Sequence, residues 1–102
     1  MFECFNYWVS GNACYNIPLA KGWRLKYQLP LEFKRCGLDT HIVYCPAFDE
    51  YGYGNSPEEA MIDLGDSIID LYKSLKRLKR RRNWGDSLCL IFDNLNYYIE
   101  RG

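Results

Sequence analysis

The stretch CPAFDEYGYGNSPEEA, residues 45–60, decides the fold that we expect, because it fixes where a strand ends and a long helix begins. Ser56 is a favoured N-cap, whose hydroxyl accepts from a backbone N–H that the first helical turn leaves unpaired. Glu59, three residues later, completes a capping box. Pro57 suits the first helical position, and Glu58 places negative charge at the positive end of the helix dipole. The sequence therefore predicts a helix that begins at Pro57.

The residues after Pro57 predict a long amphipathic helix that runs to about Arg82. Apolar residues recur at intervals of three and four, which is the spacing of one helix face. The members of this stripe are Ala60, Met61, Leu64, Ile68, Leu71, Tyr72, Leu75 and Leu78. Asn83 and Gly85 supply the stop signal, so we expect the helix to end before them.

Strands are expected on both sides of this helix. Every second residue from Leu25 to Phe33 is apolar, which predicts one strand with a buried face, and Pro30 favours an edge or a bulge. Further strands are expected at 40–45, 48–53 and 88–92, and an N-terminal hairpin at 2–9 and 14–17. Residues 95–99 either continue the last strand or form a short terminal helix.

These elements predict one α+β domain over residues 1–102, with a small antiparallel three- to four-stranded sheet and one long helix packed on it. Residues 1–22 form an N-terminal extension, 23–82 the core, and 83–102 a C-terminal strand or short helix. The 13 basic and 13 acidic residues give zero net charge, so any electrostatic function depends on how charge is distributed. No apolar run reaches the roughly 18 residues of a membrane span, and the first residues lack signal-peptide features, so we expect a cytoplasmic protein without membrane contact.

The five cysteines are scattered and odd in number, without a CxxC motif, and His41 is the only histidine. This pattern favours buried thiols over a zinc site, and we expect no metal and no cofactor. Disulfides between Cys4 and Cys14, or between Cys36 and Cys45, stay open alternatives.

The residues YCPAFD (44–49) and GNSPEEA (54–60) resemble the HicB-like domain of HicA–HicB toxin–antitoxin systems. In that family a strand ends in a proline-acidic loop, followed by a glycine, a Ser or Thr cap and a Glu-Glu-Ala helix start. The resemblance covers about residues 23–78. The positions that match are Pro46, Gly54, Ser56, Glu58, Glu59 and Ala60.

The resemblance implies a partial RNase H-like fold without catalytic carboxylates and a non-enzymatic protein that blocks a small mRNA-cleaving toxin. Association into a dimer or tetramer, through a sheet edge or the exposed helix, is our accompanying hypothesis. Many family members add a C-terminal DNA-binding domain that binds their operator; the residues after 83 leave no room for one, so this chain departs from the family pattern there. The family pattern does not explain the first 22 residues, which would hide the toxin-binding surface if they covered it.

Seven positive charges without an acid among them mark the end of the helix, and Trp84 follows. They predict either a solvated helix end, an acidic protein partner or a nucleic-acid site, where Trp84 and Tyr72 would stack on bases. The charged residues are Lys73, Lys76, Arg77, Lys79, Arg80, Arg81 and Arg82.

No catalytic residue is expected. Asp63, Asp66 and Asp70 share a helix face, which is typical of exposed surface rather than of a metal site. A hydrolase that pairs His41 with a cysteine is the remaining alternative, although no substrate follows from it.

Overall fold

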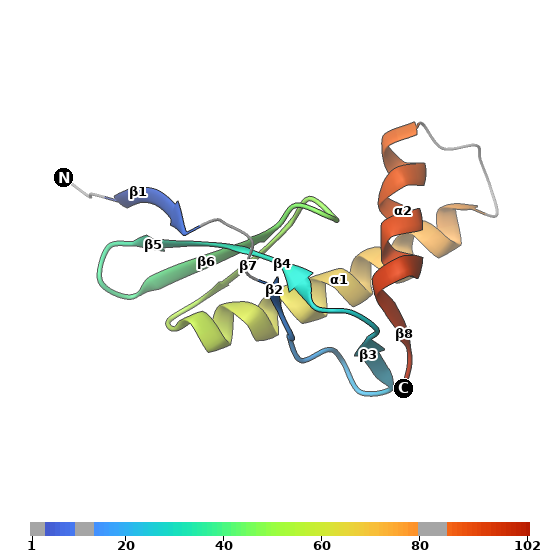
Figure 1. Ribbon diagram of the computed structural model, residues 1–102, viewed down its shortest axis with the longest axis horizontal. Helices are drawn as coiled ribbons and strands as arrows, with labels where there is room; N and C mark the ends of the chain where they lie inside the picture. Colours follow the sequence, from blue (N-terminus) through green and yellow to red (C-terminus); the bar gives the residue numbers. More distant parts are fainter. Residues whose placement is uncertain (1–3, 10–13, 80–85) are drawn as a thin grey trace.

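A four-stranded antiparallel sheet, with the long helix α1 packed along one face, forms the centre of the molecule (Figure 1). The computed structural model describes residues 4–9, 14–79 and 86–102. The strands are β1 (Cys4–Val9), β2 (Cys14–Tyr15), β3 (Trp23–Leu25), β4 (Leu29–Pro30), β5 (Glu32–Cys36), β6 (Thr40–Cys45), β7 (Glu50–Gly54) and β8 (Ile99–Arg101), and the helices are α1 (Pro57–Lys79) and α2 (Asp86–Tyr98). The predicted α+β class is confirmed.

The main sheet has the order β1-β5-β6-β7, with antiparallel neighbours throughout. Thr40–Cys45 is a strand with the expected bounds, whereas β7 begins two residues later than expected. The reason is Phe48, which is 1% exposed and lies in the turn, where its backbone N–H donates to the carbonyl oxygen of Cys45 at 3.3 Å.

Glycines in β7 let α1 approach the sheet closely. Gly52 lies opposite Val43, which is fully buried. A Cβ on Gly52 would come within 3.0 Å of backbone and side-chain atoms of Ala60 and Leu64, so only glycine fits here. Because strand residues alternate between faces, Tyr51 and Tyr53 point away from the helix.

The apolar stripe of α1 packs into the core, as expected. Ile69, which lay outside the predicted stripe, is also buried, while Leu78 is 45% exposed. The buried stripe therefore ends at Leu75, one turn before the predicted end. Its buried members are Ala60, Leu64, Ile68 and Leu75.

The predicted continuous strand from 23 to 33 is wrong, because the chain divides there into β3, β4 and β5. Each piece pairs with a different partner: β3 with β8, β4 with β2, and β5 with β1 and β6. Between β3 and β4 the backbone bends, and Tyr27 is 53% exposed instead of facing the core. Leu29 and Leu31 keep the expected buried positions.

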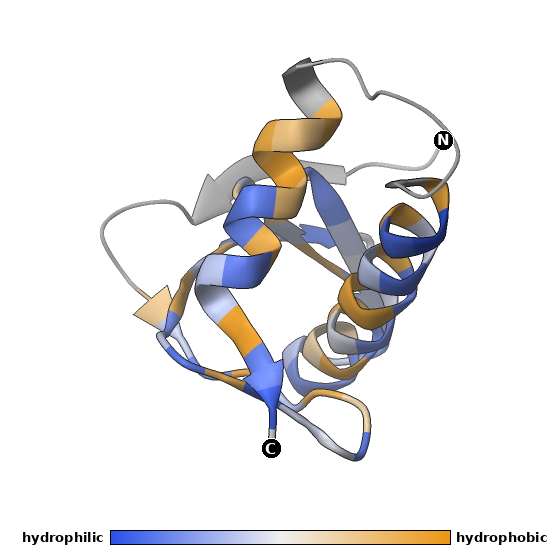
Figure 2. Cartoon of the chain, turned by 90° about the vertical axis from the view of Figure 1, so that its right-hand side faces the viewer, coloured by the Kyte–Doolittle hydropathy of each residue, from blue (hydrophilic) through white to orange (hydrophobic). Residues whose placement is uncertain are grey.

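The predicted strand at 88–92 is also wrong, since α2 spans these residues and extends through most of 95–99. Phe92 and Leu95 are buried three residues apart, which is a helical spacing. Short apolar runs do not distinguish a strand from a buried helix by periodicity alone. Figure 2 shows the apolar N-terminal half of α2, where Leu90 is 62% exposed.

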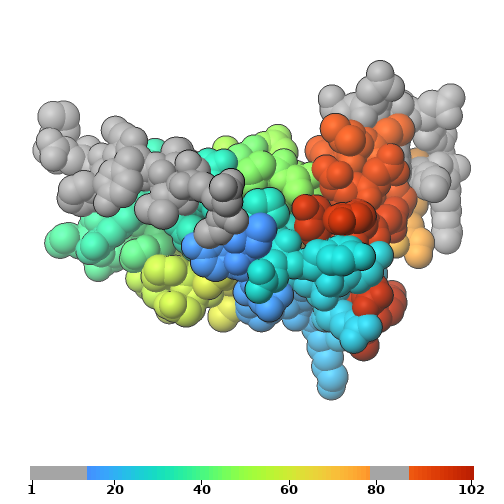
Figure 3. All heavy atoms as spheres, viewed as in Figure 1, coloured from blue at the N-terminus to red at the C-terminus, as the bar shows by residue number. Residues whose placement is uncertain are grey.

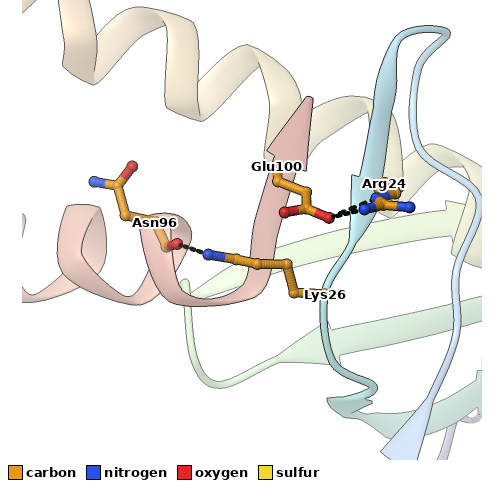
Figure 4. Close-up of polar contacts among 4 residues, drawn as sticks. All are labelled: Arg24, Lys26, Asn96 and Glu100. Atoms are coloured by element: carbon orange, nitrogen blue, oxygen red, sulfur yellow. Dashed lines mark hydrogen bonds and ion pairs between the residues drawn. The ribbon is translucent and has the colours of Figure 1, made fainter. Parts of the chain in front are cut away.

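Strand β8 pairs antiparallel with β3 and so joins the C-terminal segment to the segment before β5. The Lys26 backbone N–H donates to the carbonyl oxygen of Tyr98, and its ammonium donates to that of Asn96, both at 2.7 Å. Arg24 and Glu100 form an ion pair beside these contacts (Figure 4). Residues 22 to 26 are therefore hydrogen-bonded to the C-terminal segment.

The N-terminal hairpin does not form, because β1 pairs with β5 while β2 pairs with β4. The same pairings place Cys4 opposite Cys36 and Cys14 opposite Pro30, so Cys4 and Cys14 are not cross-strand neighbours. Cys36 lies opposite Thr40, and Cys45 lies at the other end of β6, opposite Glu50. Neither disulfide alternative is formed, and Cys36 and Cys45 are buried free thiols.

Candidate functional site

The cap that decides the helix start forms largely as expected. The Glu59 backbone N–H donates to Ser56 Oγ, and Glu59 Oε1 accepts from the backbone N–H of Asn55, both at 3.1 Å. The second bond reaches one residue further back than a standard capping box. A Cβ on Gly54 would lie 2.6 Å from the Ala60 nitrogen, so Gly54 is needed for the tight entry into α1. The residues Gly54, Ser56 and Glu59, which match the family pattern, therefore have structural roles at the start of α1.

An acidic surface lies where β7 meets the first half of α1. From residue 42 to residue 72 the chain carries seven Asp or Glu residues and no Lys, Arg or His. Asp49 directly precedes β7, and Glu59 and Asp63 of α1 accept hydrogen bonds from backbone N–H groups of Asn55 and Tyr53, so these three carboxylates lie beside the outer strand. We call this surface the acidic edge; its exposed residues are Asp49, Tyr51, Tyr53, Glu59 and Asp63.

Strand β7 is the outer strand of the sheet at the acidic edge, and no other described strand pairs with it on that side. The Tyr53 backbone N–H instead donates to Asp63 Oδ2 of α1 at 2.9 Å. This bond fastens the edge strand to the helix and occupies one donor that a further strand would otherwise use.

Three tyrosine rings form a continuous row on the sheet face opposite α1. The Tyr44 and Tyr51 centroids are 4.6 Å apart, those of Tyr51 and Tyr53 are 6.4 Å apart, and the last two side chains are 41% and 54% exposed. The Tyr44 hydroxyl donates to Asp49 Oδ1 at 3.0 Å, and this bond to a carboxylate raises the pKa of Tyr44 to about 12. Tyrosines with exposed apolar faces and a polar tip are typical of protein-binding surfaces.

The turn that carries Asp49 also contacts α2. Asn94 Nδ2 donates to the carbonyl oxygen of Ala47 at 2.7 Å. Figure 3 shows atoms of residues around the β6–β7 turn, in green, reaching the surface beside α2. The turn between β6 and β7 therefore contacts both α2 and the acidic edge. Asp49 in this turn adopts a left-handed φ of 51°.

The basic helix end is partly described. Lys73, Lys76 and Arg77 are exposed and line an open hollow of about 720 Å³ together with Asp70 and Ser74. The Lys79 side chain and residues Arg80, Arg81, Arg82 and Trp84 lie outside the described residues.

The ring of Tyr72, which would stack on a base in the nucleic-acid alternative, has neighbours inside the protein. Phe92 stacks on it at a centroid distance of 5.5 Å and Trp23 meets it edge-on at 5.1 Å. The Lys76 ammonium lies 5.8 Å from the ring centroid.

A second hollow, of about 410 Å³, lies between β5, β6 and the start of α1. His41 lines it and faces Arg35 and Gly54 across the sheet, so no nucleophile is its cross-strand neighbour. Burial raises the pKa of the Cys45 thiol to about 12, which keeps this sulfur neutral and unreactive. The lining residues are Tyr15, Phe33, Lys34, Arg35, His41, Pro57, Glu58 and Met61.

Within residues 4–9, 14–79 and 86–102, no group of three or more His, Cys, Asp or Glu side chains is placed to hold a metal ion. Asp63, Asp66 and Asp70 are exposed on α1. For the same described residues, neither helix combines the length and hydropathy of a membrane span.

Sequence reasoning missed the acidic edge, although the absence of basic residues between 42 and 72 was a readable signal. What sequence alone does not give is that β7 and α1 lie side by side and so gather these charges with Tyr51 and Tyr53. No family model, curated protein or solved structure matches the chain.

Proposed function

We propose that this protein is a non-enzymatic, HicB-like binding module that acts in the cytoplasm as an antitoxin against a small, basic, mRNA-cleaving toxin. The observation that carries the proposal is the acidic edge, where an outer strand bears two exposed tyrosines and is flanked by carboxylates of the preceding turn and of α1. A protein that cleaves RNA binds phosphates and is therefore basic on its working face. An acidic, tyrosine-bearing surface is the complement of such a face and speeds its capture.

The order of elements supports the proposal. Three consecutive antiparallel strands, β5, β6 and β7, are followed by a capped helix that covers one face of the sheet, as in the family that the sequence resembles. The N-terminal extension would block toxin binding if it covered β7. Its strand β1 pairs on β5, at the sheet edge opposite β7.

Binding of a toxin is tested by co-expression with the product of a neighbouring small gene, followed by pull-down and a translation assay. We expect a stable complex and relief of mRNA cleavage. Replacing Tyr51 and Tyr53 by Ser should weaken the complex at least about tenfold, because aromatic anchors dominate interface energies.

The matched control replaces Tyr27 and Tyr97 by Ser. These tyrosines are equally exposed, at 53% and 57%, and stack on each other away from β7. Equal weakening by both double variants, or absence of any complex with a toxin-like neighbour, argues against the proposal.

The second candidate is nucleic-acid binding by the basic helix end, and the observation that favours it is the hollow lined by Lys73, Lys76 and Arg77. Changing Lys79, Arg80, Arg81 and Arg82 to Glu should abolish RNA or DNA binding that falls steeply with salt. Unchanged binding, or none by the parent protein at low salt, rejects this function.

A further inference from the structure

The hollow of about 410 Å³ between β5, β6 and the start of α1 belongs to neither proposed function, and we call it the β5–α1 hollow. Its volume lies within the range of about 300–1,000 Å³ that is typical of small-molecule sites. Gly54 of β7 faces α1, and His41 and Arg35 follow it in register across the sheet. Cross-strand partners share a face, so these side chains lie on the helix side of the sheet, at the first turn of α1.

One wall of the β5–α1 hollow is apolar and largely aromatic. Tyr15 of β2 meets Phe33 of β5 edge-on, with ring centroids 5.0 Å apart, and Met61 of α1 adds a flexible thioether. All three side chains are half-buried and pack against the core, while part of each lines the hollow. Aromatic rings attract a further ring in stacked or edge-on geometry, so this wall favours a ligand with an aromatic body.

The charged lining of the β5–α1 hollow favours an anion. Lys34 and Arg35 contribute two positive charges, against one negative charge from Glu58. Among the described residues the Arg35 guanidinium donates to the carbonyl oxygen of Leu38 at 3.0 Å, and no ion pair joins it to Glu58. A guanidinium has five N–H donors, so this bond leaves others to face a ligand. The positive end of the α1 dipole adds to the attraction.

We propose that the β5–α1 hollow binds a small aromatic carboxylate, which is either a simple acid or an aromatic amino acid. The ring lies against Tyr15 and Phe33. Arg35 holds the carboxylate, because its planar fork of donors matches two carboxylate oxygens, and the His41 imidazole adds a hydrogen bond. Phosphates with several negative charges suit the hollow less well, since Glu58 repels them.

The ligand site is independent of the antitoxin proposal. The β5–α1 hollow lies on the helix side of the sheet, whereas Tyr51 and Tyr53 of the acidic edge point away from the helix. Failure of toxin binding therefore leaves the ligand site standing, and the reverse also holds.

Two natural reporters allow the test on the full, unmodified chain. His41 is the only histidine and Met61 is one of two methionines, so their imidazole and methyl signals are resolved by NMR, with Met61→Leu as the assignment variant. Titration with 3-phenylpropionate or L-phenylalanine should move both signals along saturable curves that share one dissociation constant, of about 1 mM or below. Tighter binding of phenylalanine identifies an amino acid, whose ammonium pairs with Glu58, and tighter binding of 3-phenylpropionate identifies a simple acid.

The neutral amide 3-phenylpropionamide tests the charge recognition. The parent protein should bind 3-phenylpropionate at least about tenfold more tightly than the amide, because only the acid pairs with the guanidinium. Arg35→Gln should remove this preference, and Arg35→Lys should keep part of it. The comparison of acid and amide in the parent protein serves if Arg35→Gln does not fold.

Lys21→Gln is the control, because it removes one positive charge at an exposed position away from the hollow. Lys21 precedes Gly22, whose carbonyl oxygen accepts from the backbone N–H of Gly102 at the C-terminal segment. This variant should bind acid and amide as the parent does. Absence of saturable shifts with both acids up to about 10 mM overturns the proposal. So does equal affinity of the parent for acid and amide, or an equal loss of acid binding in Lys21→Gln and Arg35→Gln.

Discussion

Gly65 of α1 lies so close to the carbonyl oxygen of Pro18 that no Cβ fits between them. The segment before β3 crosses the helix at this point, with Ile17 buried and Leu19 partly buried beside it. A glycine in the middle of a long helix is normally a weakness. Here the missing side chain of Gly65 makes room for the backbone of Pro18, so that Ile17 can be buried in the core.

Replacing Gly65 by Ala should therefore destabilise the protein, against the usual helix propensities. An exposed helical glycine gains about 1 kcal/mol on change to Ala, but forced overpacking costs about 1–3 kcal/mol. Urea unfolding followed by circular dichroism measures the difference. Ser74→Ala, on the same helix, should change stability by less than about 0.5 kcal/mol. A Gly65→Ala protein more stable than its parent would show that the chain does not cross α1 here.

Removing the helix cap should reduce stability without changing the core. Ser56→Ala leaves the Glu59 N–H without its acceptor and should cost about 1 kcal/mol, whereas Ser56→Asp keeps an acceptor and should be nearly neutral. Thermal unfolding of both variants gives the comparison. Equal losses in the two would mean that the side chain at position 56 acts through something other than capping.

Tyr44 should titrate late, and folding stability should depend on it at high pH. Its hydrogen bond to Asp49 raises its pKa from 10.0 to about 12, so the folded state keeps a proton that the unfolded state loses between these values. The contribution is fully present below pH 10 and is lost as pH rises towards 12. Difference titration of tyrosinate absorbance, parent minus Tyr44→Phe, measures this step.

Asp49→Asn is the matched control for that titration. Asn tolerates the left-handed φ of residue 49 and keeps an acceptor oxygen, but it removes the negative charge. The late step should then move back towards the ordinary tyrosine pKa of about 10. A late step unchanged in Asp49→Asn would assign the shift to another cause.

Cysteine reactivity should separate Cys45 from Cys89. Cys45 is fully buried and burial raises its pKa to about 12, while Cys89 is exposed on α2. Brief treatment of the native protein with iodoacetamide near neutral pH should label Cys89 and spare Cys45, and both should react in urea. Peptide mass spectrometry reads the sites. Rapid native labelling of Cys45 would contradict its buried place in the core.

The bond between Asn94 and Ala47 should hold α2 against the sheet. Asn94→Ala leaves the Ala47 carbonyl oxygen without this donor and should cost about 1–3 kcal/mol if water does not replace it. Amide hydrogen exchange should speed up in α2 more than in α1. Asn96→Ala, which removes a bond only within α2, is the control.

Local chemistry made residues 40–79 predictable from sequence. Ser56 and Pro57 mark the start of α1, and Thr40–Cys45 alternates between buried and less buried positions within the bounds expected for a strand. Signals of this kind act over a few residues, so they do not depend on the rest of the fold.

The elements that were predicted wrongly from the sequence depend on contacts between residues far apart in the chain. Residues 23–33 carry a good strand pattern, but β3 pairs with β8, about 75 residues later, and the chain must bend to reach it. Residues 88–92 are apolar enough for a strand, yet contacts of Phe92 with Tyr72 favour a helix on α1. The acidic edge was missed for the same reason, because it combines residues of β7, the turn before it and α1.

The pairing of Leu25 with Ile99 also sets the order in which the protein is completed during synthesis. The hairpins of β5, β6 and β7 and helix α1 use contacts between near neighbours in sequence, so this part forms early on a growing chain. Strand β3 is made before all of them, but its partner β8 is the last of the described strands to be made. Until then Trp23 lacks Arg101, whose guanidinium lies 4.4 Å from its ring in the finished protein. Among the described strands, one of the first to be translated is thus the last to find its partner.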